Sequence, residues 1–205
     1  MSRPLRCRAL RLLAVPVLAV VLTGCGPAQA PKPVEARPTP IARLNAAALD
    51  IPRVKYCDLI TQSAVKDALG AKAGTKDNWA NGEVAPVDGA RSDVTHEFGC
   101  RFATGTAAAE TWVFARPVDA GFARSVIAKT ARRPGCTSAP GPRFGTPSQR
   151  QTCTLAGGVT RVRFAGLFGQ TWLTCQVAAP LPAAEVTRRA GAWCVEGANA
   201  TTTSR

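Results

Sequence analysis

The chain has 205 residues and a formal net charge of +13, with 26 Lys and Arg against 13 Asp and Glu. This length favours one domain rather than two. Hydrophobic residues make up 46% of the chain and aromatic residues 6%. That composition allows a buried core, and it argues against wholesale disorder and against a protein with several membrane spans.

The first 24 residues have the pattern of an export signal. Four arginines without an acidic residue precede an apolar run over residues 12–22, which is shorter than the roughly 20 residues of a membrane-spanning helix. The run ends in L-T-G-C, which resembles a bacterial lipobox and predicts cleavage before Cys25 and a diacylglyceryl group on its thiol. Cleavage after Ala30 by an ordinary signal peptidase and retention of an uncleaved anchor are the alternatives.

Lipidation of Cys25 predicts the membrane as a partner, because two acyl chains give stable anchoring. Loss of residues 1–24 removes four arginines and no acidic residue, so the formal charge falls from +13 to +9. A basic exported domain is attracted to anionic lipid or to an anionic envelope polymer, and another envelope protein is a further candidate partner. A GC-rich genome explains the same charge without function. No basic-aromatic pattern predicts nucleic acid as a partner.

The predicted elements begin after a tether. Residues 25–53 are rich in Pro and Ala, which favours an extended spacer, and a single folded domain is expected over residues 54–199, with a disordered tail over residues 200–205. Thr61 as N-cap and Gly70 as stop predict a helix between them. Residues 71–97 are rich in Gly, Asp and Asn and predict a long loop.

Strands and helices alternate in the rest of the domain. The first half predicts strands over residues 98–104 and 111–115 and then a helix capped by Asp119, with Phe122, Val126, Ile127 and Ala131 on one face. The second half predicts strands over residues 151–155, 159–165 and 171–177 and a last helix over residues 183–196, with Val186, Ala190, Trp193 and Cys194 on its apolar stripe. The fold class is therefore α+β, with an antiparallel sheet of about five strands and helices packed on a face.

The two halves also show an internal echo. C-R-F-A-T-G at residues 100–105 matches C-T-L-A-G-G at residues 153–158, and E-T-W-V at residues 110–113 matches Q-T-W-L at residues 170–173. A strand-strand-helix duplication would explain the echo if the second copy held an insertion near residues 161–167. Chance similarity among strand sequences is the alternative.

Six cysteines remain after Cys7 in the signal and Cys25: Cys57, Cys100, Cys136, Cys153, Cys175 and Cys194. An even number in an exported chain predicts three disulfides, for which 15 connectivities exist. The echo favours the pairs Cys57–Cys100 and Cys136–Cys153, which leaves Cys175–Cys194. No C-x-x-C is present and the only histidine is His96, so neither a metal site nor a cofactor is predicted.

The segment that opens C-D-L-I-T at Cys57, ends A-L-G at Gly70 and is followed by C-R-F at Cys100 resembles a family of actinobacterial secreted lipoproteins of unknown function. That family opens with C-D-L-L and later shows C-x-W, and Phe102 stands where it more often has Trp. The resemblance covers about 50 residues. It implies a lipid-anchored extracytoplasmic domain with a helix-to-strand disulfide, and it supplies no catalytic residues.

Two patterns in the sequence could support catalysis. Ser63 and Lys66 form an S-x-x-K, the arrangement in which a lysine one helical turn away activates a serine, but S-D-N and K-T-G are absent. His96 has no accompanying G-x-S-x-G elbow. A small envelope hydrolase that uses Ser63 or His96 is therefore the alternative reading.

The favoured interpretation is a non-catalytic binding module, with a purely structural docking domain as a further alternative. Its candidate contact residues are few. Trp79 is expected in the long polar loop, where an exposed tryptophan would contact a ligand or partner. Arg161 and Arg163 share one strand face and could bind an anion or simply face solvent.

Overall fold

The computed structural model describes residues 38–88 and 91–203, without the side chains of residues 86–91. The predicted signal, Cys25 and most of the tether lie outside the described residues. In the described part, seven strands form one antiparallel sheet in the order β1-β4-β5-β9-β8-β7-β6. These strands are β1 (Thr75–Trp79), β4 (Glu97–Thr104), β5 (Ala107–Phe114), β6 (Cys136–Pro140), β7 (Ser148–Thr154), β8 (Thr160–Phe168) and β9 (Thr171–Ala179).

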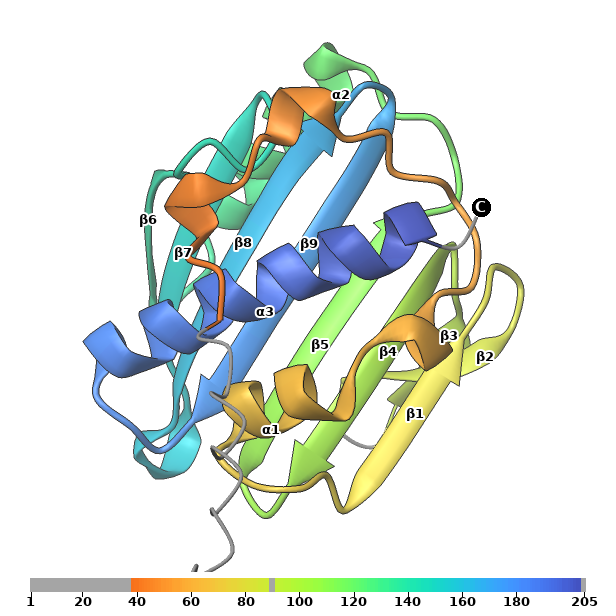
Figure 1. The fold of residues 1–205 in the computed structure, drawn as a ribbon. Helices are drawn as coiled ribbons and strands as arrows, with labels where there is room; N and C mark the ends of the chain where they lie inside the picture. Colours follow the sequence, from red (N-terminus) through yellow and green to blue (C-terminus); the bar gives the residue numbers. More distant parts are fainter. Residues whose placement is uncertain (1–37, 89–90, 204–205) are drawn as a thin grey trace, which may run out of the picture. The chain divides into compact units, whose positions relative to one another are not determined.

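A separate two-stranded hairpin and three α-helices complete the fold (Figure 1). The hairpin pairs β2 (Val84–Asp88) with β3 (Arg91–Val94) between the end of β1 and the start of β4. The helices are α1 (Gln62–Leu69), α2 (Ala120–Ala131) and α3 (Ala183–Thr203), and short 3-10 turns lie at Ile41–Arg43, Ala46–Ala48, Cys57–Leu59 and Ala156–Gly158. The α+β class with an antiparallel sheet is thus confirmed.

The helices cover the two faces of the sheet unequally. Helix α3 lies across β5, β9 and β8, with α1 beside it (Figure 1), and the main core lies between them and the sheet. Helix α2 packs on the other face, where Ala123 meets a smaller apolar cluster that includes Leu167 and Trp172. Side chains alternate between the faces along each strand, so Cys175 and Val177 belong to the main core whereas Trp172 belongs to the smaller one.

The sequence signals for the helices act as expected. The Thr61 hydroxyl accepts a hydrogen bond from the Ala64 N–H, and Gly70 ends α1 in the left-handed conformation, with φ of 79°. The Asp119 carboxylate accepts from the Phe122 N–H and begins α2. The predicted stripe of α3 is buried along its length at Val186, Ala190, Trp193 and Cys194. Phe122, however, was placed on the inner face of α2 and is 52% exposed, because Ala123, Val126 and Ile127 turn that face toward the sheet instead.

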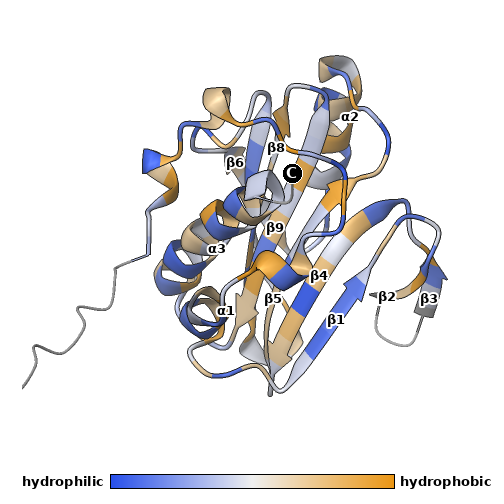
Figure 2. Ribbon diagram, turned by 45° about the vertical axis from the view of Figure 1, so that its right-hand side comes forward, coloured by the Kyte–Doolittle hydropathy of each residue, from blue (hydrophilic) through white to orange (hydrophobic). Residues whose placement is uncertain are grey.

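The structure has more strands than the sequence predicts. The expected loop over residues 71–97 contains β1, β2 and β3, and the strand β6 was not predicted. The strands β1 and β6 show no hydrophobic alternation in the sequence. They are the two edges of the sheet and carry polar sequences, T-K-D-N-W and C-T-S-A-P. Figure 2 shows β1 as a largely hydrophilic strand.

The folded part is longer than residues 54–199 at both ends. Ile51 is 1% exposed, and Ile41 and Leu44 pack against the main core. At the other end, residues 200–203 are helical rather than a disordered tail, since α3 continues to Thr203 and Thr201 is fully buried.

Three disulfides link the described cysteines: Cys57–Cys100, Cys136–Cys153 and Cys175–Cys194. This is the pairing that the echo favoured. The first joins the 3-10 turn before α1 to β4, the second joins the neighbouring strands β6 and β7, and the third joins β9 to α3.

The echo does not correspond to a simple duplication. Its two strands in the first half, β4 and β5, are neighbours, whereas the matching strands β7 and β9 are separated by β8. The residues assigned to an insertion, 161–167, lie within that central strand. The helices that follow the two copies, α2 and α3, cover opposite faces of the sheet.

Candidate functional site

A line of polar side chains crosses the sheet on the face opposite α3, with one residue from each of the seven strands. The strand registers place these residues directly opposite one another, from β1 at one edge to β6 at the other. We call them the polar row: Asp77, Arg101, Glu110, Gln176, Arg163, Gln151 and Ser138. Such side chains on a half-covered sheet face can interact with each other and with a ligand.

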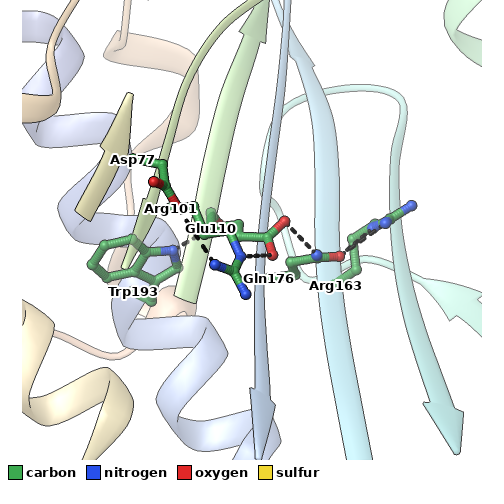
Figure 3. A network of polar contacts seen from close by, with 6 residues as sticks. All are labelled: Asp77, Arg101, Glu110, Arg163, Gln176 and Trp193. Atoms are coloured by element: carbon green, nitrogen blue, oxygen red, sulfur yellow. Dashed lines mark hydrogen bonds and ion pairs between the residues drawn. The ribbon is translucent and has the colours of Figure 1, made fainter. Parts of the chain in front are cut away.

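The first half of the row is an ion-pair network (Figure 3). Arg101 lies between two carboxylates, with Nη1 at 3.5 Å from Asp77 Oδ2 and Nε at 3.3 Å from Glu110 Oε1. The second oxygen of Glu110 accepts a hydrogen bond of 2.8 Å from the Gln176 amide nitrogen. From the other face of the sheet, the indole N–H of Trp193 in α3 donates to the backbone carbonyl of Glu110 at 2.7 Å. The carboxylate of Glu110 is therefore held between Arg101 and Gln176, and its backbone is held by Trp193.

The second half of the row is built around a cation. Arg163 donates from Nε and Nη2 to one oxygen, Gln176 Oε1, at 2.9 and 2.8 Å. Its guanidinium also lies over the ring of Trp112, 5.3 Å from the ring centre, a cation–π arrangement. The pKa of Arg163 is lowered to about 10, chiefly by burial and also by the positive charges of Arg161 and Arg133, while Glu110 and Glu97 oppose the change.

An acidic residue lies beside the row, at the start of β4. Burial raises the pKa of Glu97 to about 7, and the nearby indole of Trp79 and the charge of Arg163 oppose this rise only in part. The Trp79 indole nitrogen is buried and forms no close hydrogen bond among the described residues. Its ring lies over Gly99, where a Cβ atom would come within 2.2 Å of it, so glycine is needed at that position.

The three predicted contact residues lie in two different places. Arg161 and Arg163 alternate on β8 and share the face of the polar row, as expected. Trp79 is not an exposed loop residue: it ends β1 and is 8% exposed. It does line a shallow pocket of about 410 Å³ at the edge of the sheet, together with Tyr56, Leu59 and Asn78.

The two residues considered for catalysis are both exposed. The Ser63 hydroxyl lies 3.1 Å from that of Thr61, the N-cap of α1, and the two share a hydrogen bond. His96 lies between β3 and β4. In the described part of the chain, no hydrogen bond or ion pair connects Ser63 with Lys66 or with His96.

Sequence reasoning did not identify Arg101, Glu110 and Gln176 as site residues. Each has an apolar or small residue on both sides in its strand. This alternation indicates that the polar side chain points away from the core, and it is the only signal that the sequence offers for these residues. The pairing of those positions across strands depends on the strand order, which the periodicity of one strand does not contain.

The remaining observations concern metals and membranes. Among residues 38–88 and 91–203, no group of three or more His, Cys, Asp or Glu side chains is placed to hold a metal ion. No helix in the same ranges has the length and apolar character needed to cross a membrane.

Comparison with known proteins places the chain in no family. No family model matches it, and no curated protein matches it. Among solved structures it is similar to the extracellular domain of PknH from Mycobacterium tuberculosis, with 15% sequence identity and a TM-score of 0.43. That match covers 73% of this chain and 99% of the PknH domain.

Proposed function

We propose that this protein is a lipid-anchored extracytoplasmic domain that binds a ligand without catalysing a reaction, and that the polar row is its binding surface. The three disulfides support a location outside the cytoplasm, because such bonds persist in oxidising compartments. The lipobox pattern ending at Cys25 supports attachment to the outer face of the cytoplasmic membrane.

The observation that carries the binding proposal is the polar row itself. A sheet face that served only to pack against another layer would carry apolar side chains. Here all seven strands contribute a polar residue at one register, and four of the seven residues are charged in their ordinary states. The side chains of Arg101 and Glu110 remain partly exposed, so a ligand can reach the row.

An enzymatic role for Ser63 or His96 is the weaker candidate. The hydrogen bond between the hydroxyls of Ser63 and Thr61 lies in the capping turn of α1, where such contacts stabilise a helix end. A nucleophile needs a base within hydrogen-bond reach. Neither Lys66 nor His96 forms a hydrogen bond with Ser63 in the described part of the chain.

Two measurements test the proposed function. The full chain, expressed in an actinobacterial host, is expected in the membrane fraction and to incorporate a fatty-acid label. A Cys25→Ser variant should be released without the label, whereas Cys7→Ser, which changes a cysteine inside the predicted signal, should remain at the membrane. If the Cys25→Ser variant also stays at the membrane, the lipid anchor is contradicted.

The second measurement is native mass spectrometry of the released Cys25→Ser protein. A stoichiometric added mass that disappears on denaturation is expected for a binding domain. A bare chain, together with no ligand from a screen of envelope components, would contradict a small-molecule binding function and favour protein docking.

A further inference from the structure

Arg163 has no ion-pair partner within the described part of the chain. Arg101, on the same face, has carboxylates on both sides. Arg163 has only an amide oxygen, since both of its hydrogen bonds go to Gln176 Oε1. No carboxylate among the described residues lies within ion-pair distance of it. Glu110 and Glu97 act on it without forming an ion pair. A half-buried cation that has no contacting counter-ion is stabilised by an anion that pairs with it from solution.

The neighbouring contacts fix which edge of the guanidinium is occupied. Glu110 can only accept hydrogen bonds when ionised, so it holds the nitrogen of the Gln176 amide toward itself and turns the oxygen toward Arg163. That oxygen occupies the edge formed by Nε and Nη2. The outer edge, formed by Nη1 and the second proton of Nη2, has no hydrogen-bond partner among the described residues. Two parallel donors of this kind match two oxygens of one anion.

Charges of both signs act on Arg163, and the positive ones act more strongly than those of Glu110 and Glu97. Arg161 lies on the same face of β8, and Arg133 lies just beyond α2; both add positive potential at Arg163. Opposite Arg161, the next strands carry Ala178 and then Ala108, which are partly exposed. Their methyl groups leave room over the sheet beside the guanidinium groups.

We infer that Arg163, with Arg161 and Arg133 beside it, binds the phosphate group of a ligand on this face of the sheet. The inference rests on the proposed binding function and assigns it a ligand class. A phosphate group offers three acceptor oxygens and, as a monoester, a charge of about −1.5 to −2. A monoester therefore compensates a cluster of guanidinium groups better than the single charge of a carboxylate, whereas the phosphodiester of a lipid headgroup carries a single charge and offers two free oxygens to the two-donor edge. The phosphate could belong to a soluble ester or to a lipid headgroup, and the experiment separates these sources.

The test uses the released Cys25→Ser protein, with Arg163→Gln and Arg188→Gln variants in the same background. Arg188 is the matched control, because it is an arginine on α3 that is already paired with Glu185. Inorganic phosphate and glycerol 3-phosphate are titrated against chloride at equal ionic strength, with the arginine Nε–H signals followed by NMR. Vesicles of phosphatidylcholine with and without phosphatidylglycerol form the second arm, read by co-sedimentation.

The expected result is a saturable shift of the Arg163 Nε–H signal with phosphate, glycerol 3-phosphate or anionic vesicles. Affinity should fall about tenfold or more in Arg163→Gln and stay unchanged in Arg188→Gln. A response only to vesicles would identify a lipid headgroup, and a response to glycerol 3-phosphate would identify a soluble ester. If Arg163→Gln does not fold, Arg163→Lys replaces it: the charge is kept but the two-donor edge is lost, and a smaller loss of affinity is expected.

Two results would overturn the inference: no saturable response to any of the probes, or equal losses in Arg163→Gln and Arg188→Gln, which would indicate attraction by net charge alone. Native mass spectrometry distinguishes this failure from failure of the proposed function. A bound ligand that contains no phosphate would leave the binding function standing and remove the phosphate assignment.

Discussion

At the residue scale, Glu97 makes the stability of the domain depend on pH. Its pKa is about 7 in the folded protein, because it is buried beside the polar row, and about 4.3 in an unfolded chain. The folded state therefore holds one more proton than the unfolded state between these values. The contribution of Glu97 to stability is fully present below about pH 4 and is lost as the pH rises through 7.

This difference predicts the effect of Glu97→Gln. The amide cannot ionise, so the variant avoids a cost of about 3–4 kcal/mol that the wild type meets above pH 7. We expect the variant to be more stable than wild type at pH 8 and close to it at pH 5, as measured by urea unfolding at both pH values. An equal effect at both would contradict a neutral Glu97. Glu83→Gln gives a control of opposite sign, because Lys55 and the Ala80 N–H lower the pKa of Glu83.

At the element scale, two of the disulfides should act differently although they close loops of similar length. Cys136–Cys153 spans 17 residues and fastens the edge strand β6 to β7, whereas Cys175–Cys194 spans 19 and joins β9 to α3 in the core. Chain entropy alone assigns each bridge about 3 kcal/mol. The edge strand can detach without opening the core, so its loss should be local.

The expected result for Cys136→Ala with Cys153→Ala is faster amide exchange confined to β6 and the end of β7. Cys175→Ala with Cys194→Ala should raise exchange across β5, β8, β9 and α3 and lower the midpoint of global unfolding. Hydrogen exchange read by mass spectrometry separates the two patterns. If both double variants lose protection from amide exchange across the whole domain, the two disulfides do not differ in this way.

The elements also show what the sequence could and could not predict. Helices were placed well because Thr61, Gly70 and Asp119 act locally at helix ends. The edge strands β1 and β6 were missed because they have polar sequences and their pairing is a property of the sheet. For the site, Arg163 was recognised from its strand face, but its pairing with Gln176 joins residues of two strands whose order had to be known first.

At the scale of the whole molecule, the segment over residues 38–53 is part of the fold rather than only a tether. Ile51 is among the most buried side chains of the chain, and Ile41 approaches α3 so closely that a Cβ on Gly191 would lie 3.2 Å from its Cγ2. This segment therefore packs against α3 and covers part of the main core. Its loss would expose apolar surface of α3 and of the sheet to water.

A chain that begins at Val54 should thus be markedly less stable than one that begins at residue 38. Removal of a fully buried isoleucine alone costs about 2–5 kcal/mol, and the truncation also removes Ile41 and Leu44. Urea unfolding of both chains measures the difference, and Ile51→Ala in the longer chain should reproduce a large part of it, whereas Arg43→Ala, at an exposed position of the same segment, should not. If the two chains unfold at the same urea concentration, residues 38–53 add nothing to the stability of the domain, and the boundary near Val54 that composition suggested is the correct one.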